Sequence, residues 1–329
     1  MRFALPIALA TLATTACSRG PTEPPSDSRG AERSAEPRGA GRSARTPGAR
    51  PMPGPPPESR GPPRLGPEPP EPGPILLTTS IEHSLEVSLT RVAGPTWGAA
   101  ASQVAKRVLV WWIDPRRDLR RGDRLSLAIE FGPEGEEPAL HAIWLHSQKY
   151  DENFAAFRHQ ATGHPFDRFY ERDGREVESR LVGGPIESYE QVTSLLGDGR
   201  GHKGVDFKAP IGTPIEAPFA GRVVRRNWST RANGRCVELE GVNGVHAVFL
   251  HLSKVHVRRG QSVRAGQLIG ELGNTGHSTA PHLHYQLGKN GRVIDPFRFH
   301  ETRRARLSDE DMAAFESTVD RWERMRGGI

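Results

Sequence analysis

Proline is concentrated near the start of this chain, and that concentration limits how much of the chain can fold. Of the 29 prolines, 17 fall within residues 18–74, which contain no Phe, Trp or Tyr. A segment this poor in large apolar side chains cannot bury enough surface to offset the entropy lost on ordering. We therefore expect residues 17–74 to be a disordered tether, which leaves residues 75–329 for two domains of ordinary size.

The residues before this stretch are typical of an export signal. Met1 and Arg2 precede a short apolar stretch over residues 3–13, and the small residue Ala16 precedes Cys17. This pattern predicts a signal peptide over residues 1–16 and resembles a bacterial lipobox, whose cysteine is acylated after cleavage. We expect an exported protein of the cell envelope, anchored to the membrane through a lipid on Cys17 and facing the periplasm. The alternative is a plain secreted protein that is cleaved near Ala16.

Charge and hydropathy exclude two further classes of protein. The net charge is +6, but the 45 basic residues are interleaved with 39 acidic ones and form no tight cluster with stacking aromatic residues. We therefore expect no nucleic-acid partner, despite the basic pI. No internal run reaches the 18 apolar residues of a membrane-spanning helix, which excludes a polytopic membrane protein.

Residues 75–186 show mixed signals, which we interpret as a small α+β or mostly β accessory domain. Alternating apolar residues over 84–92 favour a strand, residues 99–107 fit a short helix, and the apolar run 108–113 is typical of a buried strand. Asp173-Gly174 is a two-residue hairpin signal.

Residues 187–300 are predicted to form an all-β domain of short antiparallel strands. Asn-Gly turns at 233–234, 243–244 and 290–291 separate apolar alternations, and no helical periodicity of useful length occurs between them.

The remaining residues, 301–329, predict a C-terminal amphipathic helix. Ser308 and Asp311 form a capping box, and Met312, Phe315, Val319 and Trp322 form one apolar stripe. We expect this helix to pack on its own domain in preference to binding a partner.

Histidine is concentrated in the predicted β domain, where eight of the 13 lie between His202 and His300. His282 and His284 are two apart in a predicted strand and so share a face. His202 and Asp206 add a nitrogen and a carboxylate oxygen. Two His and one Asp leave a fourth zinc position open, which is the pattern of a catalytic site rather than a structural one. The two cysteines exclude a cysteine-based structural zinc site, and we interpret Cys236 as a buried structural thiol.

Six segments then resemble the lysostaphin/LytM-type zinc metallopeptidases, which are bacterial cell-wall endopeptidases with a small all-β catalytic domain. The similar segments occur in order over about 100 residues, at 201–207, 212–217, 220–223, 251–253, 260–266 and 273–284. One departure is Ala280, where a glycine is usual. The region before them resembles, less sharply, the N-terminal domain of Gram-negative members.

The resemblance implies a role for each site residue. His202, Asp206 and His284 would bind one Zn²⁺ per chain, and His251 and His282 would be the unliganded catalytic pair beside it. There is no His-Glu-x-x-His motif, so histidine must take the place of the usual glutamate base. Which of His251 and His282 acts as the base stays open. We interpret the other histidines of this region as surface residues: His246, which should face away from His251, together with His256, His277 and His300.

The leading hypothesis is therefore a zinc endopeptidase that hydrolyses the peptide cross-links of peptidoglycan. The alternatives are a non-catalytic regulator that uses the same fold to bind the wall or to activate a partner amidase, and a structural envelope tether. The order of the chain also suggests that the accessory domain makes a regulatory contact with the site.

Overall fold

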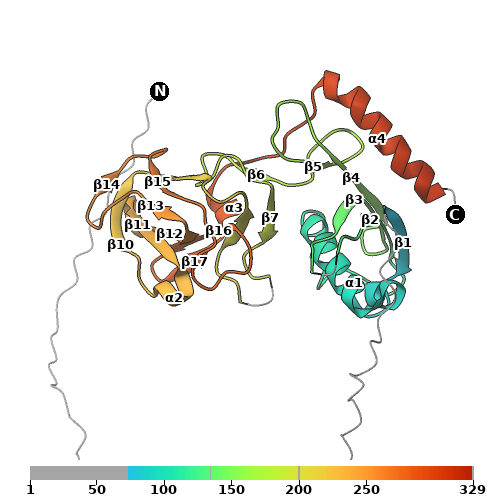
Figure 1. Ribbon diagram of the computed structural model, residues 1–329, viewed down its shortest axis with the longest axis horizontal. Coiled ribbons are helices and arrows are strands. Elements are labelled where there is room, and N and C mark those ends of the chain that lie inside the picture. The colour runs from blue at the N-terminus through green and yellow to red at the C-terminus, as the bar shows by residue number, and fades with distance from the viewer. Residues whose placement is uncertain (1–72, 134, 199–200, 328–329) are drawn as a thin grey trace, which may run out of the picture. The chain divides into compact units, whose positions relative to one another are not determined.

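The computed structural model describes residues 73–133, 135–198 and 201–327 (Figure 1). The predicted signal peptide, Cys17 and nearly all of the predicted tether lie outside the described residues. Within them, the chain is mostly antiparallel β structure with a β/α region first and a helix last, as the sequence predicts. No described helix combines the length and the apolar character that a membrane crossing requires.

The N-terminal sheet is antiparallel, and its strands pair in the order in which they occur in the chain. Its strands are β1 (Ile75–Ser80), β2 (Arg124–Glu130), β3 (Ala139–Ser147), β4 (Glu152–His159) and β5 (Arg168–Tyr170). Each side of the sheet carries apolar residues, because alternate residues of a strand point to opposite faces. Leu125 and Leu127 pack on one side, and Ala142 and Phe157 pack on the other.

Helix α1 (Leu85–Leu109) covers the first of these sides and corrects two sequence-based expectations. The residues expected to form strands at 84–92 and 108–113 belong instead to this helix and to the turn that follows it. Ser84 caps the helix by accepting a hydrogen bond from the Val87 N–H, and Leu85 and Leu89, four residues apart, are both buried. The alternation was misleading because Val87 is exposed. The helix bends at Gly94, whose φ is 77°, directly before Pro95.

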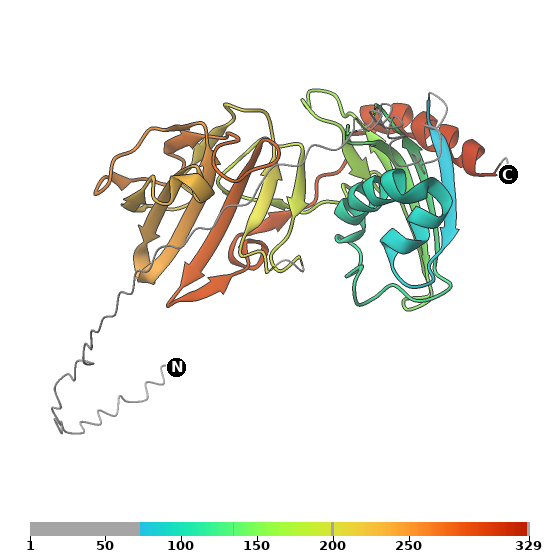
Figure 2. The same cartoon turned by 60° about the horizontal axis from the view of Figure 1, so that its bottom comes forward.

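Helix α4 (Asp309–Gly327) covers the opposite side of the same sheet (Figure 2). Ser308 caps it as predicted, since its Oγ lies 3.1 Å from the Asp311 backbone N. Phe315, Val319 and Trp322 are buried against the sheet. The last helix of the described chain therefore belongs to the N-terminal domain, which begins with β1.

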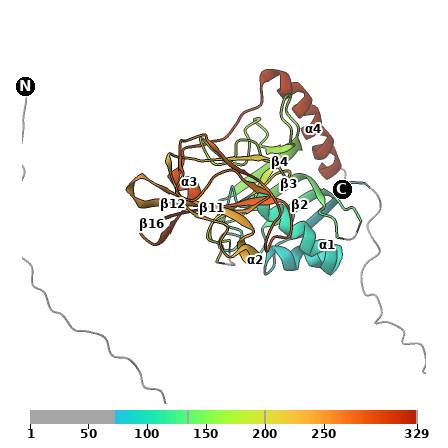
Figure 3. The same ribbon diagram turned by 60° about the vertical axis from the view of Figure 1, so that its left-hand side comes forward.

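The second sheet contains most of the later strands, paired in the order β14-β10-β11-β12-β16-β8-β7, with β17 also paired to β16. Figure 3 shows β11, β12 and β16 side by side. The strands of the whole second sheet are β7 (Gln191–Ser194), β8 (Val205–Lys208), β10 (Gly221–Arg226), β11 (Arg235–Gly241), β12 (Val245–Leu252), β14 (Ser262–Val263), β16 (His282–Lys289) and β17 (Arg292–Ile294). A smaller sheet contains β13 (Lys254–Val255), β15 (Leu268–Glu271) and β9 (Pro214–Glu216). The short helical turns are α2 (Thr230–Asn233), η1 (Val242–Gly244) and α3 (Pro296–Phe299).

Two of the three predicted Asn-Gly turns connect paired strands, and the third does not. Those at 243–244 and 290–291 connect neighbouring antiparallel strands, as predicted. Asn290 and Gly291 both have positive φ, which a tight two-residue hairpin requires. Residues 233–234 instead end the turn α2 before β11 begins.

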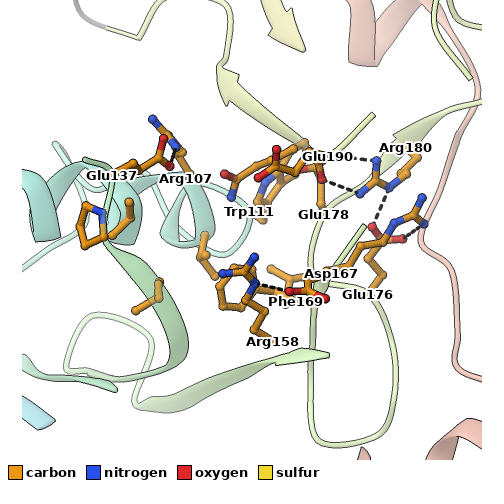
Figure 4. A pocket seen from close by; sticks show the side chains of 17 residues that line it. Arg107, Trp111, Glu137, Arg158, Asp167, Phe169, Glu176, Glu178, Arg180 and Glu190 are labelled. Atoms are coloured by element: carbon orange, nitrogen blue, oxygen red, sulfur yellow. Dashed lines mark hydrogen bonds and ion pairs between the residues drawn. The ribbon is translucent and has the colours of Figure 1, made fainter. Parts of the chain in front are cut away.

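In the chain, β6 (Arg180–Leu181) precedes the second sheet and β18 (Thr302–Arg303) follows it, and these two strands pair with each other in a separate small sheet. A largely buried group of ion pairs lies next to β6 and lines a cavity of about 70 Å³ (Figure 4). Arg180 Nε donates to Glu176 at 2.6 Å, and Glu178 accepts a hydrogen bond from the Val192 N–H at 3.0 Å. Charged side chains thus connect the end of the N-terminal sheet to the first strand of the second one.

Candidate metal centre and its neighbouring histidines

The pairing of β8 with β16 brings the predicted metal ligands together. Asp206 of β8 lies directly opposite His284 of β16. Their neighbours Phe207 and Leu283 are fully buried on the other face, which fixes the direction in which the ligands point. His202 precedes β8 and reaches the same point from the loop.

Three donor atoms converge at this point. His202 Nε2 lies 3.1 Å from Asp206 Oδ1 and 3.0 Å from His284 Nδ1, and His284 Nδ1 lies 2.9 Å from the same Asp206 oxygen. Zinc bonds of about 2.0–2.1 Å in a tetrahedron place neighbouring donor atoms about 3.3 Å apart. Two imidazole nitrogens and one carboxylate oxygen in this arrangement fit a metal ion, and they are a group of residues able to hold one.

The surroundings of these ligands also suit a cation. The His202 Nδ1 donates to the Leu195 carbonyl oxygen at 3.1 Å, which orients the ring so that Nε2 faces Asp206 and His284. Burial raises the pKa of Asp206, but hydrogen bonds from His202 and His284 outweigh it and hold that pKa well below its ordinary value. Gly204 leaves room for the His284 ring, because a Cβ there would lie 2.8 Å from the ring and 2.5 Å from the Tyr285 carbonyl oxygen.

His251 and His282 lie beside this triad, as the sequence predicts. Their ring centroids are 4.7 Å apart, and the His251 ring is 6.3 Å from that of His284. The His282 Nδ1 donates to the Ala280 carbonyl oxygen at 2.8 Å, and the His251 Nδ1 donates to the Thr275 carbonyl oxygen at 2.9 Å. A carbonyl can only accept, so in both rings Nε2 is the basic nitrogen. Burial lowers the pKa of His251, which favours its neutral form.

The prediction that His246 faces away from the site is wrong, for a reason that lies in the backbone of His251. Pairing with Gly288 of β16 places His246 on the same sheet face as His282 and His284. Regular alternation would therefore turn His251 toward the core. Its φ of 65° breaks that alternation and directs its side chain to the site. His246 itself lies near the start of β12, whereas His251 lies near its end, and the His246 Nδ1 is 3.0 Å from Glu238.

The other histidines of this region have different surroundings. His256 is exposed and bonds to Glu271, as expected of a surface residue. His277 is also exposed and lies against α2, where it lines a shallow hollow with Arg231. His300 is half-buried rather than on the surface. Its Nε2 lies 2.9 Å from the Tyr285 hydroxyl, and burial lowers its pKa to about 4.

The same domain contains a buried cysteine and a threonine that contacts His251. Cys236 is a fully buried free thiol whose pKa burial raises, as expected for a structural cysteine. Thr275 was not identified from the sequence, although it contacts His251 through its backbone. Its signal in the sequence is weak because a carbonyl contact requires no particular side chain.

Comparison with known proteins points to one family. The sequence profile of peptidase family M23 matches residues 200–296, which include all five predicted site residues. The peptidoglycan DD-endopeptidase ShyA of Vibrio cholerae is 31% identical over 252 residues, which cover 73% of this chain and 56% of ShyA. Lysostaphin of Staphylococcus simulans is 48% identical over 97 residues, 29% of this chain and 19% of lysostaphin.

A solved zinc-containing peptidase from Vibrio cholerae is 30% identical, with 72% of each chain covered and a TM-score of 0.33. The peptidoglycan DD-endopeptidase ShyC of Vibrio cholerae is 31% identical over 220 residues, 62% of this chain and 49% of ShyC. The chain thus spans about half the length of these curated Vibrio relatives.

Proposed function

Because the chain belongs to peptidase family M23, we propose that it is a zinc-dependent endopeptidase that hydrolyses the peptide cross-links of bacterial peptidoglycan. The observation that carries this proposal is the convergence of His202 Nε2, Asp206 Oδ1 and His284 Nδ1 within 3.1 Å of one another. These residues would hold the Zn²⁺, one ion per chain. Zinc, when bound, supplies Lewis acidity toward the scissile carbonyl and activates water at neutral pH.

His251 and His282 would move the protons. Each ring has its Nδ1 proton held by a backbone carbonyl, so each presents a basic Nε2. One of them would take a proton from the attacking water, and the protonated ring would stabilise the oxyanion or return a proton to the leaving amine. The rings are 4.7 Å apart, so both can serve one scissile peptide bond.

Two variants test this function against a non-catalytic regulator. His284→Ala removes one ligand and should abolish both zinc binding and peptidoglycan hydrolysis. His256→Ala is the matched control, because His256 is an exposed histidine that bonds to Glu271 away from the triad. Metal content is measured by elemental analysis, and fragments are identified by mass spectrometry. A purified chain without stoichiometric zinc, or full hydrolysis by the His284 variant, would contradict the proposal.

We propose that the bond cleaved is the cross-link to diaminopimelate after D-alanine, rather than a glycine bridge. The similarity to the DD-endopeptidases extends over 252 and 220 residues, whereas the similarity to the glycyl-glycine endopeptidase ALE-1 of Staphylococcus capitis is limited to 107. Digestion of both kinds of purified peptidoglycan distinguishes the two. Release of glycine-terminated fragments alone would contradict this choice.

We further propose export to the cell envelope and a lipid anchor on Cys17, on the basis of the small residues before that cysteine. Cys17→Ala should move the protein from the membrane fraction to the soluble fraction. Retention of the variant in membranes would contradict the anchor.

A regulatory contact from the N-terminal domain is the last part of the proposal. Glu137, between β2 and β3, lies 3.5 Å from Lys208, which stands opposite His282 on the face that carries the site. Arg107 of α1 also pairs with Glu137. Glu137→Gln should weaken this contact and raise the rate of hydrolysis. An unchanged or lower rate would count against regulation through this ion pair.

A further inference from the structure

His251 has a backbone conformation that requires support from its surroundings. Its φ of 65° lies in the left-handed region, where non-glycine residues are uncommon and cost free energy. Without that conformation the ring would point toward the core, as regular alternation dictates. The residue is 7% exposed, so solvent does little to fix the direction of its side chain.

Thr275 contacts His251 and the residue that follows it. Its carbonyl oxygen accepts from the His251 Nδ1 at 2.9 Å, and its backbone N lies 3.4 Å from the His251 carbonyl oxygen. Its hydroxyl donates to the Leu252 carbonyl oxygen at 2.7 Å and accepts from the Arg235 N–H at 2.9 Å. The hydroxyl therefore joins the segment after β15 to the ends of β11 and β12.

Two glycines keep this segment in close contact with the turn α2. A Cβ at Gly234 would lie 2.3 Å from the Thr275 carbonyl oxygen, and a Cβ at Gly276 would lie 2.2 Å from the Gly234 nitrogen. Both glycines also have positive φ. Thr275 therefore has little freedom to shift, and its carbonyl is aimed at His251 by bonds that its own side chain makes.

We propose that Thr275 is a positioning residue, whose hydroxyl fixes the carbonyl that holds His251 in its left-handed conformation with Nε2 toward the metal centre. This inference rests on the proposed hydrolytic function for its effect on rate. Its effect on the imidazole is independent of that function, because the hydrogen bond to Nδ1 determines which ring nitrogen carries the proton.

The test compares two substitutions in the full-length, zinc-loaded protein. Thr275→Val keeps the shape of the side chain but removes the hydroxyl, and Thr275→Ser keeps the hydroxyl. With a soluble cross-linked peptide as substrate, we expect Thr275→Val to lower kcat about 10- to 100-fold, the usual effect of removing a supporting hydrogen bond near a metal site. KM and zinc content should stay within about twofold, and Thr275→Ser should restore most of kcat.

Nitrogen NMR of the histidine side chains provides a readout that does not depend on activity. In the unaltered protein, His251 should carry its proton on Nδ1, and in Thr275→Val this tautomer should lose its dominance. A proton on Nε2 in the unaltered protein would overturn the proposal, as would equal losses of kcat in the two variants or an unimpaired Thr275→Val.

Two outcomes separate this inference from the proposed function. A chain that hydrolyses no peptidoglycan but shows the expected tautomer and its loss would refute the function and keep the positioning role. If Thr275→Val does not fold, as judged by thermal melting, Thr275→Ala takes its place as the variant without the hydroxyl, with the same expected losses of kcat and of the Nδ1 tautomer.

Discussion

Glu178 carries a carboxyl group that folding makes harder to ionise, and this gives a prediction whose size follows from the structure. Its side chain is buried in the charged cavity near β6 (Figure 4). Burial raises its pKa from 4.5 to about 7, against the opposing effects of Arg180, the Val192 N–H and Arg168, while the charge of Glu176 adds to the increase. Arg180 Nη1 lies 3.7 Å from Glu178 Oε1, too far for a hydrogen bond.

The sign of the effect on stability follows from the two pKa values. The folded state binds this proton more tightly than the unfolded state does, so ionised Glu178 destabilises the fold. The destabilisation is absent below about pH 4.5, grows as the pH rises and is complete above about pH 7. At about 1.4 kcal/mol per pK unit, its full size is about 3 kcal/mol.

Glu178→Gln removes the charge while keeping the shape of the side chain and an acceptor for the Val192 N–H. At pH 8 the variant should therefore be more stable than the unaltered protein by up to about 3 kcal/mol, and at pH 4.5 this advantage should be gone. Urea unfolding at four pH values between 4.5 and 8 measures the difference. Glu152→Gln, an exposed position on β4, is the matched control. A difference that does not change with pH, or a variant that is less stable at pH 8, would refute the reasoning.

Other predictions concern the helix, the metal and the thiol. Phe315→Ala should lower the free energy of unfolding by about 3–5 kcal/mol in urea melts, because Phe315 is fully buried between α4 and the N-terminal sheet; a loss below 1 kcal/mol would contradict that packing. A chelator should lower the melting temperature of the unaltered protein, and added Zn²⁺ should restore it; His284→Ala should show neither shift. Cys236 should react with a thiol reagent only after unfolding, since the thiol is fully buried; rapid labelling of the native protein would contradict this.

Local rules predicted from the sequence that the histidines of the site lie together, whereas the choice of His202, Asp206 and His284 as metal ligands came from the resemblance to the lysostaphin/LytM-type peptidases. His282 and His284 are two apart in a strand, and the pairing with β8 that brings Asp206 opposite His284 follows once both strands cover one core. The capped helix after Ser308 was predictable for the same reason. Its packing partner was not, because an apolar stripe indicates that a helix is buried without indicating which of two sheets buries it.

The sequence-based predictions were wrong where local features override a periodic pattern of apolar residues. Over residues 84–92 a short alternation matched a strand, yet the cap at Ser84 and the spacing of Leu85 and Leu89 belong to a helix. At His251 a single positive φ reverses the face that alternation assigns. At His251 the side chain is held by the Thr275 carbonyl, a contact that comes from a distant segment and leaves no periodic signal.

The position of α4 also has a consequence for the order in which the chain folds during synthesis. The N-terminal sheet is complete once β5 has been made, but the helix that covers its second face is made only after every strand of the second sheet. Until then Phe157, Ala142 and Trp144 lack the cover that Phe315 and Trp322 provide. A ribosome that stops before residue 309 would release a chain with an uncovered apolar sheet face, which is prone to aggregate or to bind chaperones.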